Sequence, residues 1–244
     1  MLKNIEGNKV PSVVFSHIDE EQWKKTSTDD LFKNQNVIVF SLPGAFTPTC
    51  SSSHLPRYNE LAAVFSAHGI DRILCVSVND TFVMNAWASA QNAQNIEFIP
   101  DGNGDFTREM GMLVDKNEIG FGQRSWRYSM LVRDGKIEKM FIEPDLPGDP
   151  FEVSDADTML DYINPQAQKP KSISMITKAG CGHCVRAKAA LKQQGLSYEE
   201  IELGENGLTN ISLQALSGNA TTPQVFVDGV LIGGANELEQ WLKG

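Results

Sequence analysis

The sequence is poor in cysteine and in positive charge, and it contains no long apolar run. Its 244 residues include four cysteines, and 21 Lys and Arg stand against 31 Asp and Glu, which gives a net charge of −10. Four thiols are too few for a disulfide-built scaffold, and a chain of this length buries a core without them. Nucleic acids and anionic membranes require clustered positive charge, and a membrane span requires ~18 apolar residues. We therefore expect neither nucleic acid nor membrane as a partner.

The first ten residues, MLKNIEGNKV, show no apolar segment of a secretory signal, so we expect a cytoplasmic protein. In a reducing compartment, thiols are catalytic, metal-binding or simply buried rather than permanently bridged. The chemistry of the chain thus depends on which of these roles its cysteines take. They are Cys50, Cys75, Cys181 and Cys184.

Apolar periodicity predicts a first domain over residues 1–163. Buried strands are expected at 37–42, 73–78, 96–99, 128–132 and 136–142, and helices from Thr47-Pro48 to Gly69, at 82–90, and from a capping box at Ser154 and Asp157 to Ile163. Arg133-Asp134-Gly135 is typical of a hairpin turn. Strands that alternate with helices indicate an α/β domain with a largely parallel sheet.

A polar segment with two prolines, residues 164–170, predicts a semi-rigid linker. After it the pattern restarts in residues 171–244. Strands are expected at 172–177, 198–203, 224–228 and 230–232, and helices at 183–194, around 208–217 and from 236. This order is enough for a complete small α/β domain.

Cys181-Gly182-His183-Cys184 lies where the strand at 172–177 gives way to a helix. A C-x-x-C motif in this context predicts a thioredoxin-like redox site, because a helix N-terminus stabilises the Cys181 thiolate and Cys184 can then close a disulfide. Zinc is the structural alternative, although it usually takes four nitrogen or sulfur ligands and no second C-x-x-C or His pair stands nearby. We expect no bound metal.

Residues 171–244 resemble a dithiol glutaredoxin. The resemblance rests on TKAGCGHC, on Thr221-Thr222-Pro223 before a strand, and on Gly233-Gly234-Ala235-Asn236 at the last helix. It implies that glutathione binds as a reducing co-substrate, with no tightly bound cofactor. The implied contacts come from Lys178, His183, Thr222, Pro223, Gly234, Ala235 and Asn236. CGHC in place of the usual CPYC, and Asn236 in place of a frequent Asp, depart from the family pattern.

Cys50 follows Thr47-Pro48-Thr49 at the start of the first predicted helix. Thr47 suits the N-cap and Pro48 the first helical position, and the spacing of three places Thr47 and Cys50 on one face. A capped helix with a buried cysteine is the plain interpretation, and a reactive thiol is the other. Spacing alone leaves both open.

The run PGAFTPTCSSSHLP resembles the active-site loop of a type 5 peroxiredoxin. DTFVMNAW, FIPDGNGDFT and GFGQRSWRYSMLV extend the resemblance over most of residues 1–163. It implies Cys50 as the peroxidatic cysteine, Thr47 and Arg127 as its activators, and Pro43 as a shield of the sulfur. His54 invites a Cys–His dyad, but we expect it to have a packing or interface role. Cys75 we expect to be a small core residue.

Together these features resemble a bacterial peroxiredoxin–glutaredoxin fusion built from two thioredoxin-like domains. We expect a glutathione-dependent peroxidase that reduces hydrogen peroxide and alkyl hydroperoxides and forms homo-oligomers. Cys181 removes glutathione from Cys50, or attacks Cys50 directly. Two alternatives stay open: a peroxide sensor that passes a disulfide to client proteins, and a glutaredoxin that binds an iron–sulfur cluster through Cys181.

Overall fold

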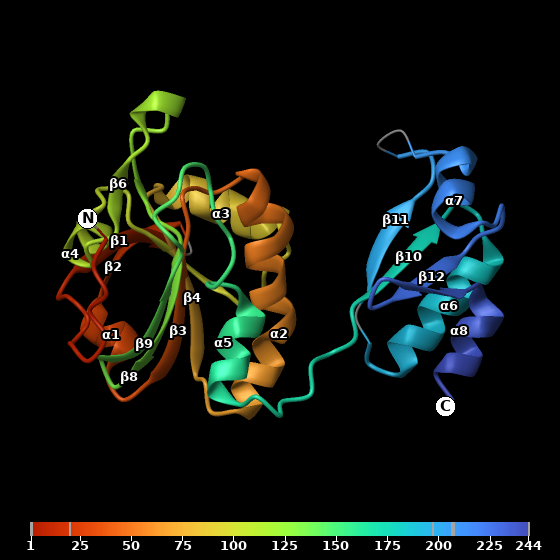
Figure 1. Cartoon of the computed structure of the whole chain (residues 1–244), viewed down its shortest axis with the longest axis horizontal. Coiled ribbons are helices and arrows are strands. Elements are labelled where there is room, and N and C mark those ends of the chain that lie inside the picture. The colour runs from red at the N-terminus through yellow and green to blue at the C-terminus, as the bar shows by residue number, and fades with distance from the viewer. Residues whose placement is uncertain (1, 20, 197, 206–207, 244) are drawn as a thin grey trace. The chain divides into compact units, whose positions relative to one another are not determined.

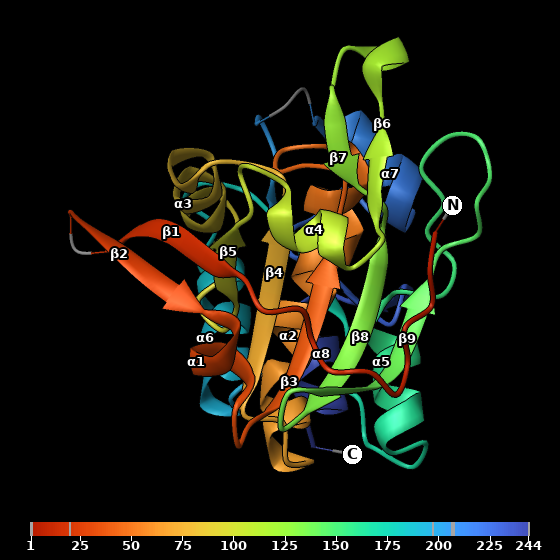
Figure 2. The ribbon, with the colours of Figure 1, turned by 90° about the vertical axis from the view of Figure 1, so that its left-hand side faces the viewer.

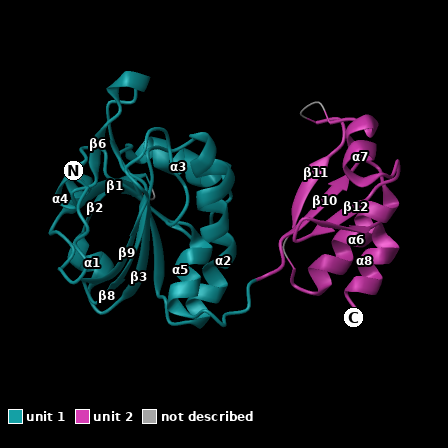
Figure 3. Cartoon of the chain, viewed as in Figure 1, with its two compact units in different colours: residues 1–169 teal, residues 170–244 magenta. Residues whose placement is uncertain are grey.

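The computed structural model describes residues 2–19, 21–196, 198–205 and 208–243. The chain divides into two compact units, Met1–Lys169 and Pro170–Gly244, which Figure 3 shows in different colours. Each unit has its own hydrophobic core. Within the described ranges, no helix combines the length and the apolar character that crossing a bilayer would take.

A five-stranded sheet with the order β5-β4-β3-β8-β9 forms the centre of the first unit (Figure 1). The strands are β3 (Asn36–Ser41), β4 (Arg72–Ser77), β5 (Glu97–Pro100), β8 (Tyr128–Arg133) and β9 (Lys136–Ile142). In β3, Val37 and Val39 pack into the core on one face, while Ile38 and Phe40 pack into the core on the other. Burial on both faces explains why this strand reads as a continuous apolar run.

The sheet is mixed rather than largely parallel. β3 pairs in parallel with β4, and β4 with β5, but β8 is antiparallel to both β3 and β9. The predicted hairpin at Asp134-Gly135 is present, with a φ of 45° at Asp134 and 71° at Gly135. A turn this tight joins only antiparallel strands, so the hairpin itself requires the departure from a parallel sheet.

Helices α2 (Leu55–Ala67), α3 (Thr81–Ala90) and α5 (Ala156–Ile163) cover one face of this sheet (Figure 1). The other face carries elements that the sequence pattern did not predict, seen from that side in Figure 2. They are β1 (Val14–Asp19), β2 (Gln22–Ser27), α1 (Thr28–Phe32) and α4 (Asp105–Glu109). A second small hairpin, also unpredicted, consists of β6 (Leu113–Asp115), η2 (Asn117–Ile119) and β7 (Gln123–Ser125).

The N-terminus of α5 differs from its prediction. Asp155, not Ser154, is the N-cap residue, and its side chain accepts the N–H of Thr158. The Ser154 hydroxyl instead donates to the buried carboxylate of Glu143. Ser154 is thus part of a polar network that reaches the first candidate site.

The second unit is a four-stranded sheet with the order β11-β10-β12-β13 and its helices. In chain order the elements are β10 (Ile173–Thr177), α6 (Gly182–Gln193), β11 (Glu199–Glu202), α7 (Asn210–Ser217), β12 (Gln224–Val227), β13 (Val230–Gly233) and α8 (Ala235–Trp241). The predicted βαβ–α–ββα order is present. Side chains of α6 and α8, among them Leu191 and Leu238, pack with Met175 of β10 and Val225 of β12.

The predicted linker, residues 164–170, lies mostly within the first unit. Ala167 packs against a hydrophobic core cluster of the first unit. Lys169 forms ion pairs with Asp157 at 3.2 Å and Asp161 at 3.0 Å, both on α5. On the other side, Lys171 pairs with Asp228 of the second unit at 2.8 Å. The stretch between these ion pairs, around Pro170, is therefore shorter than the predicted linker of residues 164–170.

Candidate active sites

Cys50 is the first residue of the π-helical turn η1 (Cys50–His54) that leads into α2, and its side chain is fully buried. The loop before it follows the C-terminal end of β3, the middle strand of the sheet. Asn79 holds this loop, because its Oδ1 atom accepts the N–H of Ala45 at 3.0 Å and the Ser77 hydroxyl at 2.8 Å. Wide π turns are rare and concentrate at functional sites. Here the turn begins with Cys50, directly after the loop that contains Thr47.

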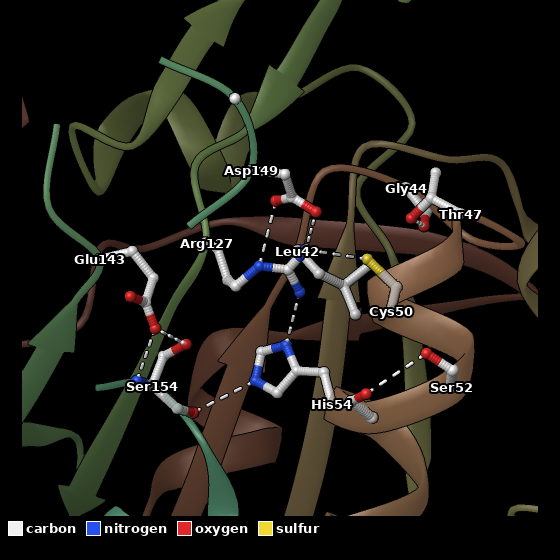
Figure 4. A network of polar contacts seen from close by, with 12 residues as sticks. Leu42, Gly44, Thr47, Cys50, Ser52, His54, Arg127, Glu143, Asp149 and Ser154 are labelled. Carbon is white, nitrogen blue, oxygen red and sulfur yellow. Dashed lines mark hydrogen bonds and ion pairs between the residues drawn. The ribbon is translucent and has the colours of Figure 1, made fainter. Parts of the chain in front are cut away.

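The helical segment begins at Thr47, whose carbonyl accepts the N–H of Ser51 at 3.0 Å. Its hydroxyl does not cap the helix as predicted. It donates to the carbonyl of Gly44 at 2.9 Å instead, and so keeps its acceptor positions toward the site (Figure 4). Thr47 and Pro43 line a cavity of about 500 Å³ together with Phe121 and Asp149. Thr47 therefore lines this cavity while its hydroxyl is held by Gly44.

Arg127 brings the distant parts of this site together, although it stands 77 residues after Cys50. Only 1% of its side chain is exposed. One Nη donates to Cys50 Sγ at 3.5 Å and to one Asp149 oxygen at 2.5 Å (Figure 4). Nε donates to the other Asp149 oxygen at 3.2 Å. The second Nη lies 3.0 Å from His54 Nδ1. Burial lowers the pKa of Arg127, but the bonds to Asp149 and the nearby Cys50 sulfur outweigh this, and the pKa rises. The residue is a fixed buried cation beside the sulfur.

His54 accepts a hydrogen bond from Arg127 and is not the base of a dyad with Cys50. Its Nε2 lies 3.2 Å from the carbonyl of Ser154, so Nε2 carries the proton and Nδ1 is free to accept from Arg127. Burial, together with the positive charge of Arg127, lowers the pKa of His54 to about 3, against the opposing effect of Ser154. A neutral His54 thus fixes one edge of the guanidinium, a more specific role than packing.

The 143–154 loop supplies the remaining partners of Arg127, and the sequence pattern did not reveal it. Glu143 is buried, and its carboxylate accepts four hydrogen bonds, from the N–H groups of Glu152, Val153 and Ser154 and from the Ser154 hydroxyl. This places the Ser154 carbonyl where both His54 and Tyr58 reach it. The same loop carries Asp149.

Cys75 of β4 lies in the same core cluster as Cys50. Burial raises its pKa well above the usual range, and the neighbouring Cys50 sulfur adds to the effect. A thiol held in its neutral form is a poor nucleophile. This fits the predicted structural role.

In the second unit, Cys181 is the N-cap residue of α6, and its sulfur accepts the N–H of Cys184 at 3.1 Å. The two cysteines form a disulfide with Cα atoms 5.2 Å apart. Cys181 is partly exposed, whereas Cys184 is buried. Within the described part of the chain, no cluster of three or more His, Cys, Asp or Glu side chains is arranged to hold a metal ion.

Several predicted glutathione contacts surround Cys181. The carbonyl oxygen and the hydroxyl of Thr222 each lie 3.5 Å from its sulfur, and the Thr222–Pro223 peptide is cis. Gly234 packs close to the Pro223 carbonyl. Lys178 and His183 are exposed.

Polar groups at the N-terminus of α8 already form hydrogen bonds within the chain. The N–H of Gly234 donates to the side chain of Glu237 at 2.9 Å. Asn236 accepts a hydrogen bond from Arg186 of α6, while Ala235 is buried. The predicted residues are therefore near one another, but two of them already have partners within the chain.

Comparisons with known proteins agree with this division. The Redoxin family matches residues 5–160, and the Glutaredoxin family matches residues 173–232. Hybrid peroxiredoxin hyPrx5 of Haemophilus influenzae is 60% identical over 240 residues, which cover 98% of this chain and 99% of that protein. Peroxiredoxin sll1621 of Synechocystis is 56% identical over 64% of this chain and 89% of its own length.

Among solved structures, reduced Prx3 of Vibrio vulnificus in complex with hydrogen peroxide is similar to this chain. It has a TM-score of 0.62 and 39% identity, covering 66% of this chain and 99% of that one. The predicted fold class, two thioredoxin-like α/β domains in this order, is confirmed.

Proposed function

The chain belongs to the redoxin family as a hybrid peroxiredoxin that carries a glutaredoxin domain, and from this premise we propose that glutathione drives its peroxidase cycle. A thiol peroxidase is the activity that this family assignment supports. The electron donor, the peroxides and the residues that act on them are our proposal.

In the first step, the Cys50 thiolate attacks the terminal oxygen of hydrogen peroxide or of an alkyl hydroperoxide. The O–O bond breaks, the sulfur becomes a sulfenic acid, and the leaving oxygen takes a proton and departs as water or alcohol. Arg127 donates to the oxygens as negative charge builds on them, and Thr47 orients the peroxide. Pro43 limits access to the sulfur.

In the second step, the thiol of glutathione displaces water from the Cys50 sulfenic acid and leaves a mixed disulfide. The Cys181 thiolate then attacks the glutathione sulfur, which releases Cys50 as a thiolate and moves glutathione to Cys181. A second glutathione then releases it as glutathione disulfide. Alternatively, Cys184 displaces it as reduced glutathione and forms the Cys181–Cys184 disulfide, which two further glutathione molecules reduce to give glutathione disulfide. We favour this route over direct attack of Cys181 on Cys50.

The geometry around Cys50 carries the proposal. A fully buried sulfur lies 3.5 Å from the buried guanidinium of Arg127. Asp149, which accepts from the same guanidinium, lines a cavity together with Thr47 and Pro43. The other cysteine before residue 181 is Cys75, whose thiol is kept neutral in the core. A partner that resolves oxidised Cys50 must therefore come from outside the first unit, and the second unit offers the partly exposed Cys181.

Peroxide consumption with glutathione as the sole reductant tests the proposal. We expect the wild type and Cys75→Ala to turn over, Cys50→Ser to be inactive, and Cys181→Ser to stop after one oxidation per chain. Turnover in Cys50→Ser would contradict the role of Cys50. A wild type that stalls after one oxidation would favour the sensor alternative.

Mixing the two inactive variants separates the routes of transfer. If glutathione is transferred between the sites, Cys181 of the Cys50→Ser chain can remove it from Cys50 of the Cys181→Ser chain. The mixture then regains activity. A mixture that stays inactive would show direct transfer within one chain.

A further inference from the structure

Asp149 has a position that the peroxidase mechanism above does not use. Both of its carboxylate oxygens accept from one edge of Arg127, and the nitrogen that donates to it at 2.5 Å also faces Cys50 Sγ at 3.5 Å. The carboxylate and the sulfur are therefore at most about 6 Å apart. A guanidinium Nη carries two hydrogens, so Asp149 and Cys50 engage the same nitrogen at once.

Charge balance changes at this nitrogen during the reaction. With Cys50 as a thiolate, the single Arg127 cation faces two anions. Once the sulfur is a sulfenic acid or a mixed disulfide, Asp149 is the anion that remains in contact with Arg127. A buried cation without a counter-charge is strongly unfavourable, and the Arg127 side chain is 1% exposed.

We propose that Asp149 is a positioning residue that acts on Cys50 through Arg127, and that it moderates how readily the thiolate forms. The carboxylate holds the guanidinium edge in place through every state of the sulfur. It also neutralises part of the Arg127 charge that would otherwise stabilise the Cys50 thiolate in full. This inference rests on the proposed function of Cys50 and Arg127.

Holding the loop in place does not explain Asp149. The carboxylate of Glu143 already fixes the 152–154 end of this loop with four hydrogen bonds. Lys116 fixes the middle, since its Nζ donates to the carbonyl of Gly148 at 3.2 Å. The side chain of Asp149 is turned to Arg127 rather than to the loop itself (Figure 4).

The other titratable groups around the site are few. His54 is neutral on one edge of Arg127, Cys75 keeps its proton, and the Glu143 carboxylate faces residues 152–154. Across the cavity stand the side chains of Asp115, Lys116 and Glu118. Of these groups, His54 alone hydrogen-bonds to the Arg127 guanidinium, so among the described residues Asp149 is the charged side chain that pairs directly with Arg127.

The test compares Asp149→Asn with Asp145→Asn, the same change at an exposed position of the same loop. Both are made in full-length chain with Cys181→Ser and Cys184→Ser, so that the signal comes from the first unit. Thiolate absorbance is followed against pH, with Cys50→Ser subtracted. The rate of Cys50 oxidation by one equivalent of hydrogen peroxide is followed by stopped flow across the same pH range.

We expect Asp149→Asn to move both pH profiles down by about 0.5–1 pH unit, because removing a charge so near the sulfur favours the thiolate even in partly exposed surroundings. At high pH, where the thiolate is complete, its oxidation is expected to be about tenfold slower, because the guanidinium is less well held. Asp149→Glu should restore the pH profile, and Asp145→Asn should match the parent chain.

An unmoved or raised pH profile in Asp149→Asn overturns the inference, whatever happens to the rate, since a purely structural role would slow the reaction without changing its pH dependence. If the parent chain itself is not oxidised at Cys50, the proposed function fails instead. The two failures are thus distinguishable.

Discussion

Replacing Arg127 with lysine separates the charge of this residue from its shape. Arg127 makes contacts with four acceptors, namely His54 Nδ1, both Asp149 oxygens and Cys50 Sγ. A lysine keeps the positive charge but has one nitrogen and no planar fork. It can stay near Asp149, but it cannot also hold the donor geometry beside the sulfur that His54 and Asp149 fix together.

The expected loss follows from the role given to Arg127. Removing one preorganised donor to developing oxygen charge typically costs about 2.7–4 kcal/mol, or 10²–10³ in rate. We expect about a 100-fold fall in the rate constant of Cys50 oxidation, ~2.7 kcal/mol. The retained charge should leave the pH dependence of this rate close to that of the wild type, in contrast to Asp149→Asn.

Stopped-flow tryptophan fluorescence provides the assay. The Trp87 indole donates to the hydroxyl of Ser51, the residue next to Cys50, at 3.0 Å, so it senses changes in this turn. Arg133→Lys, a change in an exposed ion pair with Glu138, is the matched control and should react like the wild type. A rate for Arg127→Lys within a factor of about three of the wild type would refute the orienting role assigned to the guanidinium.

Three further outcomes follow from the structure. Because the pKa of His54 is lowered from 6.5 to about 3, the unfolded chain binds a proton below pH 6.5 that the folded chain does not. Denaturant titrations should therefore show the free energy of unfolding of the wild type falling by about 1 kcal/mol relative to that of His54→Gln between pH 6.5 and 5.5. The same pH dependence in both proteins would contradict this. Glu143→Gln should lower the free energy of unfolding by about 2–4 kcal/mol, since an amide cannot accept four hydrogen bonds. The exposed control Glu138→Gln should change it by less than about 0.5 kcal/mol. Equal losses in the two variants would refute the role of the buried carboxylate. Limited alkylation of the reduced chain, read by mass spectrometry, should label Cys181 before Cys184, because Cys181 is the more exposed; the reverse order would exchange their roles.

Local sequence signals predicted two α/β domains and the redox motif of the second, whereas at Cys50 they left a buried and a reactive thiol both open, and the family resemblance favoured the reactive one. A C-x-x-C motif after an apolar strand places its thiols at a helix N-terminus, and the structure has Cys181 as the N-cap of α6. Cys50 and Thr47 are likewise close in sequence, so their proximity follows from local geometry. The hydroxyl of Thr47 bonds Gly44 rather than the helix end because the loop folds back on itself.

Tertiary contacts account for what the sequence pattern missed. Arg127 reaches Cys50 across 77 positions, so only resemblance to a family pointed to it. Asp149 and Glu143 lie in an irregular loop, where no periodicity marks a residue as buried or paired. The β1–β2 hairpin has a mostly exposed second strand, so its apolar alternation is weak.

The site of the first oxidation tests the central claim most directly. Intact-mass and peptide mass spectrometry of the Cys181→Ser chain, after one equivalent of hydrogen peroxide and then glutathione, should show one glutathione attached, on Cys50. Adding the Cys50→Ser chain, whose C-x-x-C motif is intact, should remove that adduct. An adduct on Cys75, or a Cys50 that stays a free thiol after peroxide, would contradict the account.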